Sequence, residues 1–210
     1  AASEGCWTGR NDPRPYVPGL PPEVPHASSL KGLFSAMACC TRCDLAPGRT
    51  QVVAGVGPKR ARVLFLGEAP GAREDEGGEP FVGAAGRLFT RLLEEAGISR
   101  SDVFITNVVA CRPPKNRAPR PAEIRAHAPW LEQQIRLVAP DVIATLGRTA
   151  LTYFLPGAKI TELTGTPQTL AWNGRQVTLL PLFHPAAALR SPDRVPALEA
   201  GFAVLRRLLG

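Results

Sequence analysis

Four short apolar runs, each followed by a helical pattern, constrain the fold of this chain more than any other feature. The runs are too short and too rich in β-branched residues for helices, so we expect buried strands. These strands are predicted at residues 62–66, 103–109, 141–146 and 177–183. Helical spacing of apolar residues is found at residues 84–96, 121–138, 148–154 and 196–209. Strands that alternate with helices form right-handed crossovers, which predicts an α/β fold with a four-stranded, mainly parallel sheet covered on both faces.

Proline, cap and turn residues indicate the domain boundary, the first helix and one hairpin. Residues 1–27 are rich in proline, which excludes helices and central strands, so we expect an extended N-terminal arm there. Residues 28–210 would form the folded domain, starting with a helix that carries Leu30, Leu33, Phe34 and Met37 after a Ser28 or Ser29 cap. Asn173-Gly174 indicates a hairpin turn between residues 169–172 and 175–179.

The carboxyl ends of the four predicted strands carry most of the candidate functional groups. In order, these ends hold residues 67–71 (GEAPG), Asn107, Gly147 and His184. Open parallel sheets bind ligands beyond the carboxyl ends of their strands. We therefore expect these residues to meet in one ligand site.

Charge and cysteine content narrow the partner class and the compartment. The net charge is +7, mostly from arginine, which contacts phosphate through two hydrogen bonds and stacks on bases, so nucleic acid is the leading partner. A soluble protein that is merely basic is the alternative. Five cysteines, an odd number, without a secretory signal favour a reducing cytoplasm and a metal site. No apolar run is long enough for a membrane helix, and we expect a monomer.

Residues 67–88, GEAPGAREDEGGEPFVGAAGRL, carry a specific family resemblance. They resemble the signature of family-4 uracil-DNA glycosylases, and the likeness continues in order through residues 105–123, 129–135, 140–147 and 183–190. The resemblance implies a three-layer αβα sandwich, removal of uracil from single- and double-stranded DNA, and a structural 4Fe–4S cluster.

The resemblance also implies roles for individual residues. Glu68 matches the acid near the attacking water, and Phe81 matches the aromatic on which the flipped uracil stacks. Asn107 matches the reader of the pyrimidine edge, and His184 matches the donor to the departing base. Glu74 would exclude the thymine methyl. The remaining base-site positions are Gly67, Ala69 and Gly71, while Asp75 is expected to be structural.

Two further groups would contact DNA outside the base pocket. Leu189 and Arg190 are candidates for the wedge that enters the base stack when the base flips. The loop after the Asn107 strand carries Arg112, Lys115 and Arg117, which should face phosphates.

The metal ligands depart from the family pattern at one position. Cys40, Cys43 and Cys111 match three cluster cysteines, but His127 stands where the family has the fourth. His127 as an iron ligand, a Cys₃His zinc site, and a cluster that uses Cys39 instead are the competing interpretations. We favour an iron–sulfur cluster over zinc, and over buried cysteines without a metal, because the surrounding loop resembles the family throughout. Cys6 lies outside the pattern.

The rival functions are a related glycosylase and a binding protein. The glycosylase type that bonds to DNA through a histidine in an inserted basic loop lacks support, because no such insertion separates Asn107 from Trp130. A non-catalytic iron–sulfur or zinc DNA-binding module has no need for Glu68, Asn107 and His184 together. No lysine lies near these motifs, so a simple hydrolysis without a lyase step is predicted.

Overall fold

The computed structural model describes residues 24–210. Most of the predicted N-terminal arm, together with Cys6, lies outside the described residues. The strands are β1 (Val63–Gly67), β2 (Phe104–Asn107), β3 (Val142–Leu146), β4 (Gln168–Trp172) and β5 (Arg175–Leu182). The α-helices are α1 (Leu30–Ala38), α2 (Ala72–Gly77), α3 (Ala84–Glu95), α4 (Pro121–Val138), α5 (Arg148–Phe154), α6 (Ile160–Leu163), α7 (Pro185–Arg190) and α8 (Val195–Leu209).

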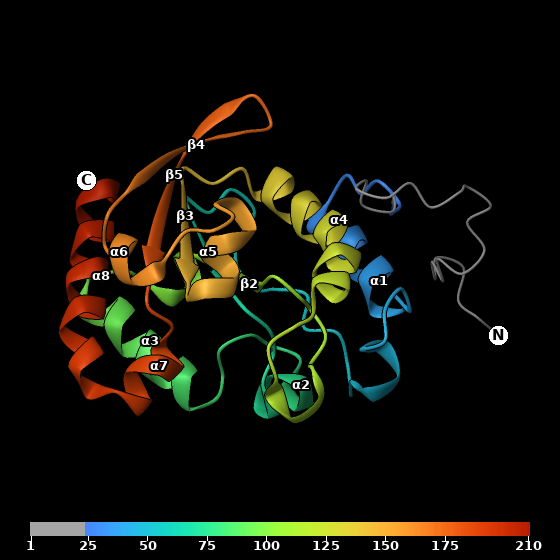
Figure 1. Ribbon diagram of the computed structural model, residues 1–210. Coiled ribbons are helices and arrows are strands. Elements are labelled where there is room, and N and C mark those ends of the chain that lie inside the picture. The colour runs from blue at the N-terminus through green and yellow to red at the C-terminus, as the bar shows by residue number, and fades with distance from the viewer. Residues whose placement is uncertain (1–23) are drawn as a thin grey trace.

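The predicted α/β fold is confirmed, but its sheet has five strands rather than four. The order is β2-β1-β3-β5-β4, with every neighbouring pair parallel except β4 and β5 (Figure 1). The predicted turn joins these two strands, with Asn173 and Gly174 both at positive φ (48° and 74°). β4 forms the sheet edge and alternates between partly buried and exposed residues, so it lacks the continuous apolar run of the other strands.

Helices cover both faces of the sheet, because alternate residues of each strand point to opposite sides. On β1, Val63 and Phe65 pack under α3, α7 and α8, whereas Leu64 and Leu66 pack under α4 and α5. Figure 1 shows α3, α7 and α8 on one side of the sheet and α4 on the other. The result is the three-layer αβα sandwich that the resemblance implied.

The N-terminal helix α1 packs on the outside of α4. Ser29 caps α1 by accepting a hydrogen bond from the Gly32 amide at 3.2 Å, as predicted. Leu33 and Met37 then pack against Trp130 of α4. This contact brings the end of α1, with its cysteines, beside the loop that follows β2. Within residues 24–210, none of the helices has both the length and the apolar character that crossing a bilayer requires.

Candidate active site and metal centre

A cleft of about 370 Å³ lies beyond the carboxyl ends of β1, β2, β3 and β5. It is where the polar groups at the predicted strand ends converge. The lining residues are Glu68, Ala69, Pro70, Gly71, Glu74, Phe81, Ala85, Asn107, Pro113, Asn116, Arg117, Leu146, Gly147, Arg148, His184, Ala186 and Arg190. The topology therefore brings together side chains that are far apart in the sequence.

Phe81 forms one wall of the cleft in a strained backbone conformation. Its φ is +57°, which is rare for a residue with a bulky side chain. Glu74 holds the loop, because its carboxylate accepts hydrogen bonds from the amides of Val82 (3.0 Å) and Gly83 (2.8 Å). The Phe81 ring stacks beside the His184 ring, with centroids 5.6 Å apart and planes 27° apart.

Asn107 stands opposite Gly67, its parallel partner at the end of β1. Only 4% of Asn107 is exposed, and the tight fit depends on the missing side chain of Gly67. A Cβ atom on Gly67 would lie 2.3 Å from Asn107 Oδ1 and 2.8 Å from the Phe81 ring. Glycine at this position therefore lets the Asn107 amide and the Phe81 ring meet above the strand.

His184 precedes α7, and its ring has a defined tautomer. The Ala186 amide donates to His184 Nδ1 at 3.1 Å, so Nδ1 is an acceptor and Nε2 carries the proton of the neutral ring. Burial, together with the nearby Arg190 guanidinium, lowers the pKa of His184 to about 4. His184 is thus a neutral hydrogen-bond donor at physiological pH.

Glu68 and the loop after it differ in part from the sequence expectation. Glu68 lines the cleft, and its carboxylate accepts a hydrogen bond from the hydroxyl of Thr149, a contact absent from the sequence prediction. The turn that carries Glu68 is followed by the short helix α2, which was not among the predicted helices. Asp75 on this helix is buried and accepts from the Thr50 amide at 3.0 Å, as its expected structural role requires.

The residues expected to contact DNA divide into two groups. Arg117 and Arg190 line the cleft, whereas Arg112, Lys115 and Leu189 do not. The Arg117 guanidinium forms an ion pair with the buried Glu123 carboxylate at 2.6 Å, so it is less available to phosphate than expected. Asn116 and Arg148 also line the cleft and were not predicted from the sequence. Arg148 directly follows Gly147 at the end of a predicted strand, so including one more residue after that strand would have identified it.

The predicted metal ligands gather where α1, the loop after β2 and α4 meet. Cys40, Cys43 and Cys111 are the free cysteines of the described residues, and the three thiols interact electrostatically. His127 is 5% exposed, and its Nδ1 lies 2.8 Å from the Glu123 carbonyl, which leaves Nε2 as a lone-pair donor. Arg49 donates to the Cys111 sulfur at 3.3 Å. Among residues 24–210, no three His, Cys, Asp or Glu side chains are placed to share one metal ion.

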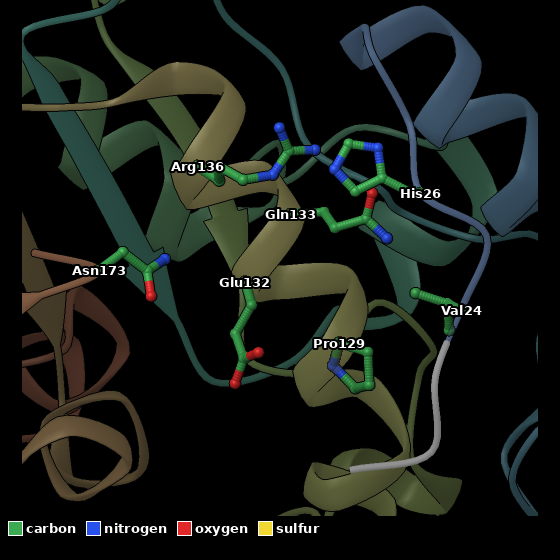
Figure 2. A pocket seen from close by; sticks show the side chains of 7 residues that line it. All are labelled: Val24, His26, Pro129, Glu132, Gln133, Arg136 and Asn173. Atoms are coloured by element: carbon green, nitrogen blue, oxygen red, sulfur yellow. The ribbon is translucent and has the colours of Figure 1, made fainter.

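A second cavity, of about 410 Å³, is lined by the start of the described chain and by α4 (Figure 2). Three of its polar side chains make hydrogen-bond contacts with neighbouring segments. Gln133 donates to the Pro25 carbonyl at 2.9 Å, and Arg136 donates to the Ala27 carbonyl at 2.7 Å. Glu132 lies at hydrogen-bond distance, 3.5 Å, from the Tyr153 hydroxyl. These contacts fasten residues 25–27 to α4 and form no candidate catalytic group.

Comparison with known proteins agrees with this geometry. The family model of the uracil DNA glycosylase superfamily matches residues 54–206. A type-4 uracil-DNA glycosylase of Thermotoga maritima is 49% identical over 154 residues, or 72% of this chain and 79% of the relative. The type-4 uracil-DNA glycosylase of Sulfurisphaera tokodaii is 41% identical over 86% of this chain and 84% of the relative. That of Archaeoglobus fulgidus is 39% identical over 87% of this chain and 94% of the relative. This chain therefore belongs to the uracil DNA glycosylase superfamily, and within it to the type-4 group.

Proposed function

We propose that this chain hydrolyses the N-glycosidic bond of deoxyuridine in single- and double-stranded DNA. The reaction releases free uracil and leaves an abasic site for base excision repair. The observation that carries this proposal is the cleft that combines Phe81, Asn107, His184 and Glu68 at the strand ends. The names of the type-4 relatives support the same reaction.

Phe81 and Asn107 bind and select the base. The flipped uracil stacks on Phe81, which contributes ~1–3 kcal/mol. The Asn107 amide oxygen accepts from uracil N3–H, and its NH₂ group donates to O4. Cytosine presents the opposite donor and acceptor at both atoms, so a buried amide rejects it by a factor of ~10⁴ or more. Glu74 fixes the loop that carries Phe81, and we propose that it also excludes the thymine methyl.

His184 and Glu68 act on bond cleavage. As the N1–C1′ bond breaks, negative charge moves onto the base, and the neutral His184 Nε2–H donates to uracil O2. Removing a donor of this kind typically lowers the rate by ~10²–10³. Glu68 orients the water that attacks C1′, accepts its proton and stabilises the positive charge that develops on the sugar.

The basic and apolar residues at the cleft bind DNA around the flipped nucleotide. Arg190 lies in the cleft lining, Lys115 is exposed on the loop after β2, and Arg112 lies on the same loop. Arg117 contributes as a positioned charge held by Glu123. Leu189 is 50% exposed and would fill the gap that base flipping leaves in the stack.

Three thiols and an imidazole are a donor set suited to a 4Fe–4S cluster. The same three thiols and imidazole could bind a zinc ion, and we favour the cluster because the loop around Cys111 resembles that of family-4 glycosylases throughout. We propose that Cys40, Cys43, Cys111 and His127 hold this cluster, which stabilises the fold and takes no part in bond cleavage. We also propose that the protein is a monomer and that it acts in the reducing cytoplasm, where thiols at these positions stay free.

Uracil release from an oligonucleotide with one uracil, with a thymine oligonucleotide as control, tests the activity. Asn107→Ala and His184→Ala should lose excision while DNA affinity is retained. If folded, metal-replete protein binds DNA but releases no uracil, the non-catalytic DNA-binding module is the correct alternative.

The fourth ligand is tested by iron and sulfide content and by visible absorbance. We expect about four irons per chain in the wild type and in His127→Cys, and a marked loss in His127→Ala. Full iron content in His127→Ala, with unchanged absorbance, would exclude His127 as a ligand.

A further inference from the structure

We infer that Thr149 is a positioning residue for the Glu68 carboxylate. Its hydroxyl donates to Glu68 Oε2 from the first turn of α5, across 81 positions of sequence. Among residues 24–210, Thr149 supplies the side-chain hydrogen bond to that carboxylate. The inference rests on the proposed function, because it concerns how Glu68 is aimed at the attacking water.

The backbone around Thr149 is fixed by close packing at the end of β3. Gly147 adopts a φ of +90°, and its amide donates to the Leu182 carbonyl at 2.8 Å. A Cβ atom on Gly147 would lie 3.1 Å from the His184 Cβ, so the start of α5 sits directly against the histidine. The position of Thr149 is therefore fixed relative to His184, which in the proposed mechanism donates to the leaving base. Through its hydrogen bond, Thr149 also fixes the position of the Glu68 carboxylate relative to His184.

The hydrogen bond from Thr149 gives the two carboxylate oxygens of Glu68 different partners. With Oε2 engaged by Thr149, the other oxygen of Glu68 is left to accept from a water molecule in the cleft. A glutamate side chain has three rotatable bonds, and without an anchor it would sample rotamers that aim the carboxylate away from C1′. The anchor thus acts on orientation, and misplacement by about 1 Å can lower a rate by ~10²-fold.

Three variants separate positioning from a general effect on the fold. Thr149→Val keeps the shape and removes the hydroxyl, and Thr149→Ser keeps the hydroxyl. The matched control is Thr152→Val on the same helix, because the Thr152 hydroxyl bonds only backbone carbonyls, of Arg148 (3.0 Å) and Thr149 (3.3 Å).

Single-turnover excision of uracil by the cluster-containing protein gives the readout, with enzyme concentration varied to obtain the maximal rate and half-saturation separately. We expect Thr149→Val to lower the maximal rate by about 10- to 100-fold, with half-saturation changed less than about twofold. Thr149→Ser and Thr152→Val should stay within about threefold of the wild type. Should Thr149→Val melt below the assay temperature, Thr149→Ala replaces it.

A double-mutant cycle with Glu68→Gln decides whether Thr149 acts through Glu68. In that background, adding Thr149→Val should change the rate less than about twofold, because the carboxylate that it orients is already gone. A wild-type rate in Thr149→Val, or an undiminished effect in the Glu68→Gln background, would overturn the inference. A wild-type protein that releases no uracil would instead refute the proposed function, so the two failures are distinguishable.

Discussion

Replacing Gly67 by alanine should disable the base pocket while the fold survives. Gly67 ends β1, and its missing side chain leaves room for both the Asn107 amide and the Phe81 ring. The added methyl carbon would lie 2.3 Å from Asn107 Oδ1, and 2.8 and 2.9 Å from two carbons of the Phe81 ring. Ordinary contact begins near 3.4 Å, so the amide must retreat by about 1 Å and the ring by about half of that.

The magnitude follows from these displacements. A shift of about 1 Å in a substrate-positioning group typically lowers the rate by ~10²-fold. In the proposed mechanism the Asn107 amide selects uracil through two hydrogen bonds at once, so discrimination against cytosine should weaken along with the rate. Overpacking at one buried position typically costs ~1–3 kcal/mol of stability, which leaves the variant folded at room temperature.

Single-turnover excision and thermal denaturation together test this reasoning. The matched control is Gly48→Ala, because no atom lies within 4 Å of a Cβ at Gly48. We expect wild-type excision from the control, and about a hundredfold loss from Gly67→Ala at a temperature where both are folded. Wild-type excision by folded Gly67→Ala would refute the claim that the Gly67–Asn107 fit positions the base.

Three further outcomes are expected. Leu189→Ala should lower excision from duplex DNA by about tenfold and leave single-stranded excision nearly unchanged, since only the duplex has a stack to fill; equal losses on both substrates would contradict the wedge. The pKa of His184 near 4 keeps its ring neutral, so the excision rate should not fall between pH 8 and pH 5.5. If the pKa were 6.5, the rate would fall about tenfold over this range, because most rings would be protonated. A fall in rate centred near pH 6.5 that disappears when His184 is replaced would contradict this prediction. The Arg117 guanidinium lowers the pKa of Glu123 below its usual 4.5, so the pair stabilises the fold above that pH and less below it. Glu123→Gln should therefore lower Tm at pH 7, by a margin that shrinks as the pH falls below 4.5 toward the lower pKa of the folded state.

The elements that the sequence predicted best are those with strong apolar periodicity. The helices at residues 121–138 and 148–154 were predicted at their observed bounds, and each bound of the parallel strands was predicted to within two residues. The strand predicted to reach residue 109 ends at Asn107, although the amides of the next two residues still bond to the carbonyls of Gly67 and Glu68. Helix α2 was missed because its flanking glycines read as loop residues, although Gly78 serves as a left-handed helix cap.

The composition of the cleft was predictable, whereas the contacts within it were not. Parallel topology alone requires the strand ends to meet, which places Asn107 and His184 together. The bond from Thr149 to Glu68 and the pairing of Arg117 with Glu123 depend on where loops fold back, which no local pattern encodes. Arginine in a basic loop predicts phosphate contact equally well whether or not a buried carboxylate lies nearby.

The strained backbone at Phe81 indicates that its ring is held in a fixed position in the cleft before DNA binds. A bulky residue at φ +57° costs about 1–3 kcal/mol and persists only where its surroundings fix it. Three contacts do so: the Glu74 carboxylate binds the next two amides, Arg100 donates to the Pro80 carbonyl at 2.8 Å, and Gly86 admits the Phe81 carbonyl where a Cβ would collide at 1.9 Å. The ring therefore needs no reordering when a base stacks on it, and binding energy is not lost to ordering the site. In the proposed function, adaptation to DNA is therefore expected at exposed positions such as Leu189, and not at the residues that hold the base.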